Sequence, residues 1–137
     1  MNQRYKMGLF LLRITVGIIF FIHGFDKFQK GLETTVATFA DLGLPGFLAY
    51  IVAVIELIGG LAMVVGAGTR VMAALFALIM FGAIVTVKLS AGFLGGFEFN
   101  LILLVAAVHL LFSGSQGLAL DSLLARSLKR VSIFRKR

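Results

Sequence analysis

The sequence has no cysteine and no tryptophan, a single proline, and only six acidic residues in a chain of 137. Without cysteine, the chain can form no disulfide, no thiolate metal site and no thiol nucleophile. Charged residues amount to 14% of the chain, against about 25% in soluble domains, whereas 60% of the residues are hydrophobic. With so little charge and a mean hydropathy of +1.05, the chain is predicted to be an integral membrane protein.

Four runs nearly free of charge are long enough to cross about 30 Å of hydrocarbon. They cover residues 8–26, 47–67, 71–88 and 98–113, and we expect the last and shortest to gain a turn from the glycine-rich segment before it. We therefore predict an all-α integral membrane four-helix bundle with antiparallel spans over residues 1–121. A basic amphipathic tail follows over residues 122–137.

Positive charge is concentrated on one side of this predicted bundle. Arg4 and Lys6 precede the first span, Arg70 separates the second from the third, and six basic residues follow the fourth. The positive-inside rule then places both termini in the cytoplasm. The tail suits the anionic inner leaflet of the bilayer, where each basic residue contributes about 1 kcal/mol, although it could also act only as a topology signal. Nucleic-acid binding is the poorer explanation.

Residues 31–46 connect the first two predicted spans on the outer side. Val36 and Phe39 fall on one side of a helical projection, which predicts a short interfacial helix in this first outer loop. Gly43 can end that helix, and Pro45 can open the next span at a position where its missing N–H costs nothing.

Ionisable residues at membrane depth are the most informative feature. An unpaired charge at the bilayer centre costs at least about 2.5–3.5 kcal/mol, so each should face the bundle interior. Arg13, His23 and Lys27 fall within an arc of roughly 80° on the first helix. Arg13 and Glu56 differ in height by roughly 8 Å, and we predict that they face each other. They could equally be an ion pair that only fixes helix register.

The fourth span carries a second polar stripe, because Glu98 and His109 are eleven residues apart and nearly eclipsed. His109 could also be a bundle histidine without a functional role. His23 and His109 differ in height by roughly 18 Å, so they cannot both ligate one haem iron. No metal-binding spacing such as HExxH occurs, so we predict no metal site, and no cofactor is evident in the sequence.

Glycines in and beside the spans are most simply close-packing residues. Gly59 and Gly60 follow Glu56 by three and four residues, so a neighbouring helix can approach beside the carboxylate. The other glycines interpreted in this way are Gly17, Gly24, Gly66 and Gly82.

A resemblance to a known family extends over roughly residues 8–121. It is carried by five segments: LLRITVGIIFFIHGFDKF, LGLPGFLAYIVAVIELIGG, GTR, GFEFNLILLVAAVHLL and LALD. In them, Arg13, the His23-Gly24-Lys27 group, the Glu56 group, Arg70 and the Glu98-to-Asn100 group resemble the pattern of the DoxX family of small four-helix membrane proteins. The family name derives from subunits linked to thiosulfate or quinol oxidation, and many members carry only an oxidoreductase label. The resemblance implies a protein of the bacterial plasma membrane that handles quinones or related aromatic electrophiles.

A quinone headgroup suits the polar stripe of the first helix. His23 titrates near neutrality and can donate a proton, and Lys27 can donate a hydrogen bond to an oxyanion. We predict that both line the outer mouth of a cavity, with Gly24 leaving room for a flat ring and Glu98 as the counter-charge of Lys27. A snorkelling interfacial pair is the alternative. The predicted catalytic residues are His23, Lys27 and Glu56, and the predicted ligand-binding residues are Arg13, Phe20, Gly24, Lys88, Glu98, Asn100 and His109.

Three classes of function remain open from the sequence. The first is a quinone-linked oxidoreductase or its membrane subunit, which would receive electrons from a bound quinol or from a soluble redox partner. The second is a transporter of small aromatic compounds, with Arg13 and Glu56 as its gate. Since four helices make a thin wall, a transport pathway would require a homo-oligomer. The third is a membrane anchor for a soluble redox enzyme.

Overall fold

The computed structural model describes residues 2–115, 119–125 and 127, and these residues form helices and their connections. The main helices are α1 (Gln3–Lys30), α2 (Leu32–Asp41), α3 (Phe47–Val65), α4 (Thr69–Ala83) and α5 (Glu98–Ser113). Between α4 and α5 lie two π-helical turns, η1 (Ile84–Lys88) and η3 (Phe93–Phe97), and a 3-10 turn, η2 (Leu89–Ala91). Most of the predicted basic tail, residues 126 and 128–137, lies outside the described residues.

The prediction of an all-α chain with four spans is confirmed. In the described part of the chain, four helical stretches are long and apolar enough to cross a membrane, namely Gln3–Lys30, Phe47–Val65, Thr69–Ala91 and Phe93–Ser113. The first helix is longer than predicted, and the fourth span does gain a turn from its glycine-rich approach. Large apolar side chains such as Ile58 (62% exposed) and Ile102 (66% exposed) point outward, as a surface in contact with lipid requires.

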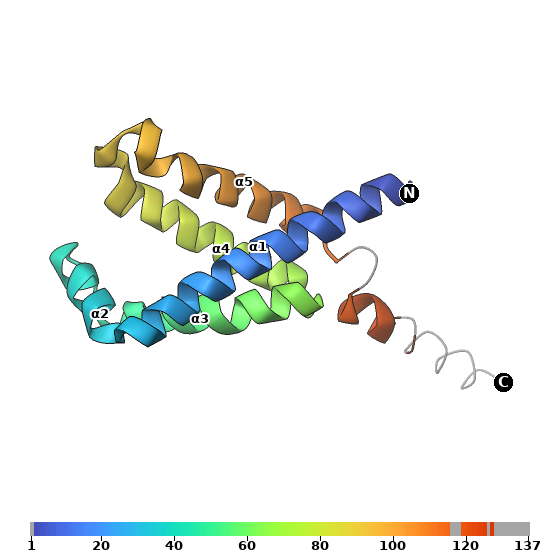
Figure 1. Ribbon diagram of the computed structural model, residues 1–137, viewed down its shortest axis with the longest axis horizontal. Helices are drawn as coiled ribbons and strands as arrows, with labels where there is room; N and C mark the ends of the chain where they lie inside the picture. Colours follow the sequence, from blue (N-terminus) through green and yellow to red (C-terminus); the bar gives the residue numbers. More distant parts are fainter. Residues whose placement is uncertain (1, 116–118, 126, 128–137) are drawn as a thin grey trace.

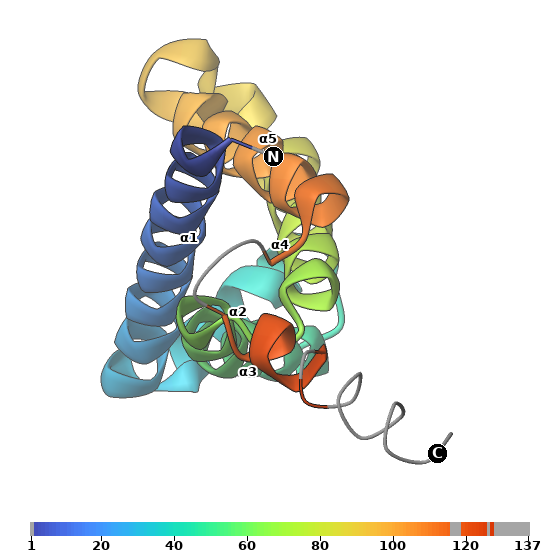
Figure 2. The ribbon, with the colours of Figure 1, turned by 90° about the vertical axis from the view of Figure 1, so that its right-hand side faces the viewer.

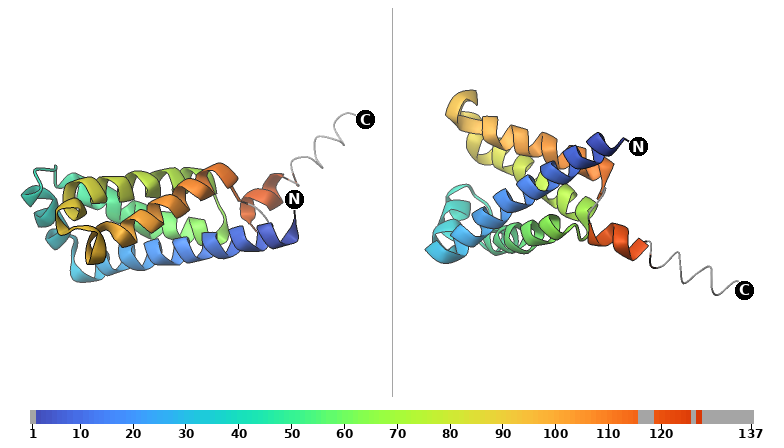
Figure 3. Two further views of the ribbon diagram at one scale, coloured as in Figure 1. Left: turned by 90° about the horizontal axis from the view of Figure 1, so that it is seen from above. Right: turned by 45° about the vertical axis from the view of Figure 1, so that its right-hand side comes forward.

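The spans form two antiparallel pairs, α1 with α3 and α4 with α5, which diverge toward one end of the molecule (Figure 1 and Figure 3). We call this the loop end, because α2 and η1 to η3 lie there. At the opposite, terminal end, the start of α1 lies beside the end of α5, where the Tyr5 hydroxyl is 3.3 Å from Oγ of Ser113. Figure 2 views the bundle from the terminal end, with the α3–α4 turn at the same end.

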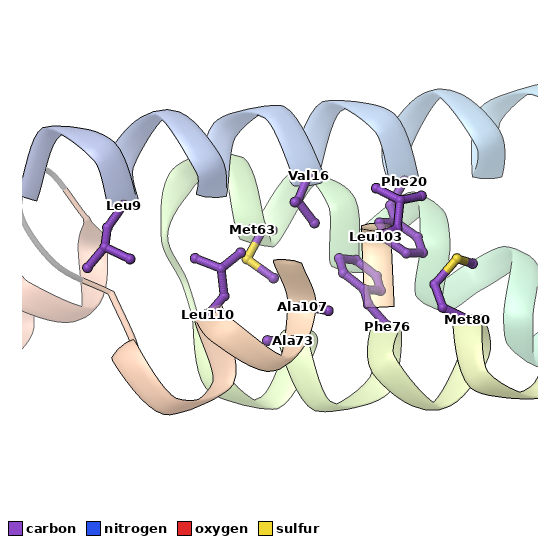
Figure 4. Close-up of a cluster of buried hydrophobic side chains, with 10 residues drawn as sticks. All are labelled: Leu9, Val16, Phe20, Met63, Ala73, Phe76, Met80, Leu103, Ala107 and Leu110. Atoms are coloured by element: carbon purple, nitrogen blue, oxygen red, sulfur yellow. The ribbon is translucent and has the colours of Figure 1, made fainter. Parts of the chain in front are cut away.

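A buried apolar cluster holds the two pairs together (Figure 4). Phe20 of α1 and Phe76 of α4 stack at its centre, with ring centroids 3.7 Å apart and planes inclined by 3°. The other members of the cluster are Leu9, Val16, Met63, Ala73, Met80, Leu103, Ala107 and Leu110. Because these side chains fill the bundle from the terminal end to its middle, any large internal space must lie nearer the loop end.

The first connection contains the predicted short helix, α2. It ends where expected, because Gly43 has a φ of 72° and the next residue, Leu44, donates its N–H to the Phe39 carbonyl at 2.9 Å. Pro45 then precedes α3, and its carbonyl accepts a bond from the N–H of Leu48 at 3.1 Å. Whether α2 lies at a membrane interface stays a prediction.

Candidate functional site

The register between α1 and α3 is set by glycines. A Cβ on Gly24 would lie 2.8 Å from Cα of Leu57, and one on Gly60 would lie 2.8 Å from the carbonyl oxygen of Gly17. Only glycine permits such a close approach of two helix backbones, which confirms the close-packing interpretation at these positions. For Gly82 that interpretation is wrong, because an added Cβ would meet nothing within 4 Å. Because Gly24 lies opposite Leu57, the next turn of α1 lies beside Glu56.

Lys27 and Glu56 form an ion pair at that level, in which Nζ of Lys27 donates to Oε2 of Glu56. The Glu56 side chain is 5% exposed and that of Lys27 is 24% exposed. His23 lies one turn before Lys27 on the same face of α1. A carboxylate, an ammonium and an imidazole are therefore grouped at one place on the inner face of the α1–α3 pair.

A pocket of about 800 Å³ lies between the two helix pairs in the loop-end half of the bundle. Its walls are mostly aliphatic and aromatic, and the polar side chains of the α1–α3 wall are those of His23, Lys27 and Glu56. On the opposite wall, η1 contributes Thr86 and Lys88, and α5 contributes Asn100. A few polar groups in a mainly apolar cavity of this size are typical of sites for small organic ligands.

The structure brings together six of the predicted site residues, which all line this pocket: Phe20, His23, Lys27, Glu56, Lys88 and Asn100. Asn100 contacts Met80, with Nδ2 3.5 Å from Sδ. The His23 ring faces Phe99 across the bundle, with centroids 6.3 Å apart. The carboxylate partner of Lys27 is Glu56 rather than the predicted Glu98.

The predicted pairing of Arg13 with Glu56 is wrong. Nη1 of Arg13 donates to the carbonyls of Met63 and Val64, at 2.9 and 3.0 Å, in the last turn of α3. Terminal helix carbonyls lack partners within the helix, so a buried guanidinium satisfies them and also complements the helix dipole. Arg13 thus lies on the terminal side of the pocket and does not line it.

Three other predicted ligand-binding residues also lie outside the pocket lining. Gly24 leaves room for the backbone of Leu57 rather than for a ligand ring. Glu98 accepts a bond from the N–H of Gly95 at 2.8 Å and so stabilises the turn before α5. His109 is exposed near the end of α5, with Nε2 3.4 Å from Oγ of Ser113.

Sequence reasoning did not find several residues of the pocket wall. Phe39, Leu42 and Leu44 reach it from α2 and the segment that follows. The apolar side of α2 was visible in the sequence, but it was interpreted as facing the interface. Thr86 lies in the π-helical turn η1, for which no signal was recognised.

Charged residues also cap helices at the terminal end. Asp121 accepts bonds from the N–H groups of Gly68 and Thr69, at 3.0 and 3.2 Å, at the start of α4. Burial alone would raise the pKa of Asp121, but these two backbone bonds, a bond from Ser115 and the charge of Arg13 hold that pKa below its ordinary value. The segment after α5 is therefore attached to the α3–α4 turn.

These features define a helical membrane protein with four candidate spans and a large pocket near one end. The chain belongs to the DoxX family, whose sequence profile matches residues 8–89. It is 47% identical over 133 residues to the "Putative oxidoreductase CatD" of Bacillus subtilis (strain 168), with 97% of this chain and 98% of that protein covered.

A second relative is an uncharacterized membrane protein of Mycobacterium tuberculosis (strain ATCC 25618 / H37Rv). It is 33% identical over 130 residues, and the match covers 84% of this chain and 80% of that protein. The comparison with solved structures gave no match.

Proposed function

We propose that the protein is an oxidoreductase, or the membrane subunit of one, that binds a quinone or a related aromatic electrophile in the pocket. The observation that carries the proposal is the position of the Lys27–Glu56 pair and His23 in the wall of a mainly apolar cavity of about 800 Å³. The relative named an oxidoreductase, which matches nearly the whole chain, supports the redox part of the proposal. The location is the bacterial plasma membrane.

The residues in the wall suit the binding of a carbonyl-bearing ring. Lys27 has donors left beyond its bond to Glu56 and can donate to a quinone oxygen, and this bond strengthens as the oxygen becomes an oxyanion. Phe99, which also lines the pocket, offers a ring to the headgroup, whereas Phe20 forms part of the pocket wall while it stacks on Phe76. Lys88 on the opposite wall is a further hydrogen-bond donor in the lining.

The same residues can supply protons. Reduction of a quinone to a hydroquinone takes up two electrons and two protons, and the imidazole of His23 lies in the pocket wall as a proton donor. Glu56, bound to Lys27, can receive a proton and pass it on as the charge on the ligand changes. The electrons come from a reduced partner, which by chemical class is a second quinol or a soluble redox protein.

Binding is tested by titrating menadione, a naphthoquinone, into the purified protein in lipid nanodiscs. We expect His23→Ala to weaken binding by about tenfold or more, because a hydrogen bond to a charged group contributes about 1.5–3 kcal/mol. The matched control is His109→Ala, which removes the other histidine of the chain, outside the pocket lining. Equal affinities for wild type and both variants, or no saturable binding by the wild type, would contradict the proposal.

A further inference from the structure

The pocket is larger than a single ring needs. Pockets of about 300–1,000 Å³ hold drug-sized ligands, and a volume of about 800 Å³ is near the top of that range. The polar lining residues are His23, Lys27 and Glu56 on the α1–α3 wall and Thr86, Lys88 and Asn100 on the opposite wall, whereas the part of the lining between α3 and α4 is aliphatic. A ligand that fills this space therefore has a polar ring and a sizeable apolar extension.

We infer that the ligand carries a long alkyl chain and that the chain passes into the lipid between α3 and α4. This inference rests on the proposed function for the headgroup and adds the chain and its route. We call the route the α3–α4 gap, and its walls are formed by Leu48, Ile51, Ile55, Leu75, Leu78 and Gly82.

Packing between α3 and α4 explains why a gap is present. The two helices are close at Gly59, where an added Cβ would lie 3.0 Å from Sδ of Met72 and 3.1 Å from the Phe76 ring. Beyond that point the helices diverge toward the loop end (Figure 1). Ile51 and Leu78 line the pocket and yet are 47% and 68% exposed, so they lie where the pocket opens to the outer surface.

The surroundings favour access from the bilayer. At the loop end, Phe39, Leu42 and Leu44 from α2 and the segment after it form part of the lining and cover one side of the pocket. On the side between α1 and α5, the opposed rings of His23 and Phe99 narrow the opening. The α3–α4 gap is instead bordered by aliphatic side chains, which suit contact with an alkyl chain rather than with water.

Gly82 offers a way to close the gap without disturbing the fold. It lies in α4, lines the pocket, and a Cβ built on it meets nothing within 4 Å. Gly82→Leu should thus add volume in the gap while increasing helix propensity. Gly8 in α1 also has open space around its Cβ and lies outside the pocket lining, so Gly8→Leu is the matched control.

The experiment compares menadione with the same naphthoquinone carrying a decyl chain, each titrated into nanodiscs of fixed lipid content. Because variants are compared at one lipid concentration, partitioning of the ligand into lipid cancels. Gly82→Leu is expected to weaken binding of the decyl compound by about tenfold or more, because the added side chain occupies the space through which the alkyl chain passes. The affinity of Gly82→Leu for menadione should differ from that of wild type by less than about threefold. Gly8→Leu should bind both compounds with the wild-type affinity.

Each other outcome has a distinct meaning. If the wild type binds both compounds and Gly82→Leu weakens neither, or weakens both equally, the α3–α4 route is wrong and the proposed function stands. If the wild type binds neither compound, the route and the proposed function fail together. Leu78→Trp, on the same wall of the gap, fills the gap at a second position. It must also weaken binding of the decyl compound.

Discussion

At the scale of single residues, buried charges in this bundle satisfy groups that would otherwise lack partners. Arg13 is 1% exposed and donates to carbonyls at the end of α3, and Glu56 is 4% exposed and accepts from Lys27. An isolated charge in such surroundings would be costly, so each requires a partner. The two charged groups differ in their access to a ligand. Arg13 is on the terminal side of the pocket, whereas Lys27 and Glu56 are in its wall.

Removing one member of the Lys27–Glu56 pair should destabilise the protein strongly. Lys27→Met leaves a buried carboxylate, and we expect a loss of about 3–5 kcal/mol in the free energy of unfolding. Adding Glu56→Leu should recover part of this loss, because the uncompensated charge is then gone. Unfolding in mixed micelles measures both, and strictly additive effects would contradict the pairing.

A second ion pair provides the control for this cycle. Lys30 and Asp26 are one turn apart on α1, with Nζ 2.8 Å from Oδ2, and their side chains are 71% and 51% exposed. Exposed pairs contribute about 0–1 kcal/mol, so Lys30→Met should have little effect on unfolding.

The sequence correctly placed Arg13 and Glu56 in the bundle interior, but it wrongly placed Glu98 and His109 there and did not indicate which residues pair. Periodicity correctly placed Lys27 on the same helix face as His23, and both line the pocket. The Arg13–Glu56 prediction failed because the relative height of two helices was estimated from span ends, and α1 extends beyond its predicted span to Lys30. The true register depends on backbone contacts between glycines, which a single sequence does not specify.

At the scale of helices, two glycines illustrate opposite roles. Gly24→Ala should force α1 away from Leu57 and cost about 1–3 kcal/mol, as overpacking does. Gly82→Ala, in open space on α4, should stabilise the protein by about 0.5–1 kcal/mol through helix propensity. Unfolding in mixed micelles distinguishes them, and a Gly24→Ala variant as stable as wild type would contradict the described packing of α1 on α3.

The cap of α4 predicts a pH dependence. Because the pKa of Asp121 is lowered in the folded protein, its contribution to stability is present above the pKa of an unfolded Asp, about 3.9, and is lost as pH falls through the lower folded value. Asp121→Ala should cost about 0.5–2 kcal/mol at pH 7, and the difference from wild type should shrink below about pH 4.

The control for this cap is Asp41→Ala, which removes an exposed carboxylate at the end of α2. It should leave the free energy of unfolding nearly unchanged at both pH values. A constant difference between wild type and Asp121→Ala from pH 7 to pH 3 would show that the carboxylate does not act as the cap.

At the scale of the whole molecule, the two helix pairs are joined by a core near the terminal end and separate toward the loop end (Figure 3). The number of spans and the extent of α5, 98–113, could be predicted from apolar runs alone. The divergence of the pairs could not be predicted in this way. It depends on the close approach of α3 and α4 at Gly59 and Phe76, and on the aliphatic side chains that line the space between the two helices beyond that point. The pocket is a consequence of that divergence.

The direction of the bundle in the membrane remains a prediction from its charges. A reporter fused after Arg137 should be active only in the cytoplasm, and one inserted at Gly92, in the α4–α5 connection, should be active only outside. Activity of the Arg137 fusion on the outer side would reverse the assignment.

The central claim is that the pocket between the two helix pairs binds a quinone. A photoreactive azidoquinone, irradiated with the protein in nanodiscs and followed by mass spectrometry, tests this directly. We predict labelling of peptides around Phe20 to Lys27, Ile51 to Glu56 and Leu75 to Lys88, suppressed by excess unlabelled menadione. Labelling confined to the exposed outer surface or to the terminal end around Tyr5 and Ser113, or labelling that menadione does not suppress, would contradict the claim.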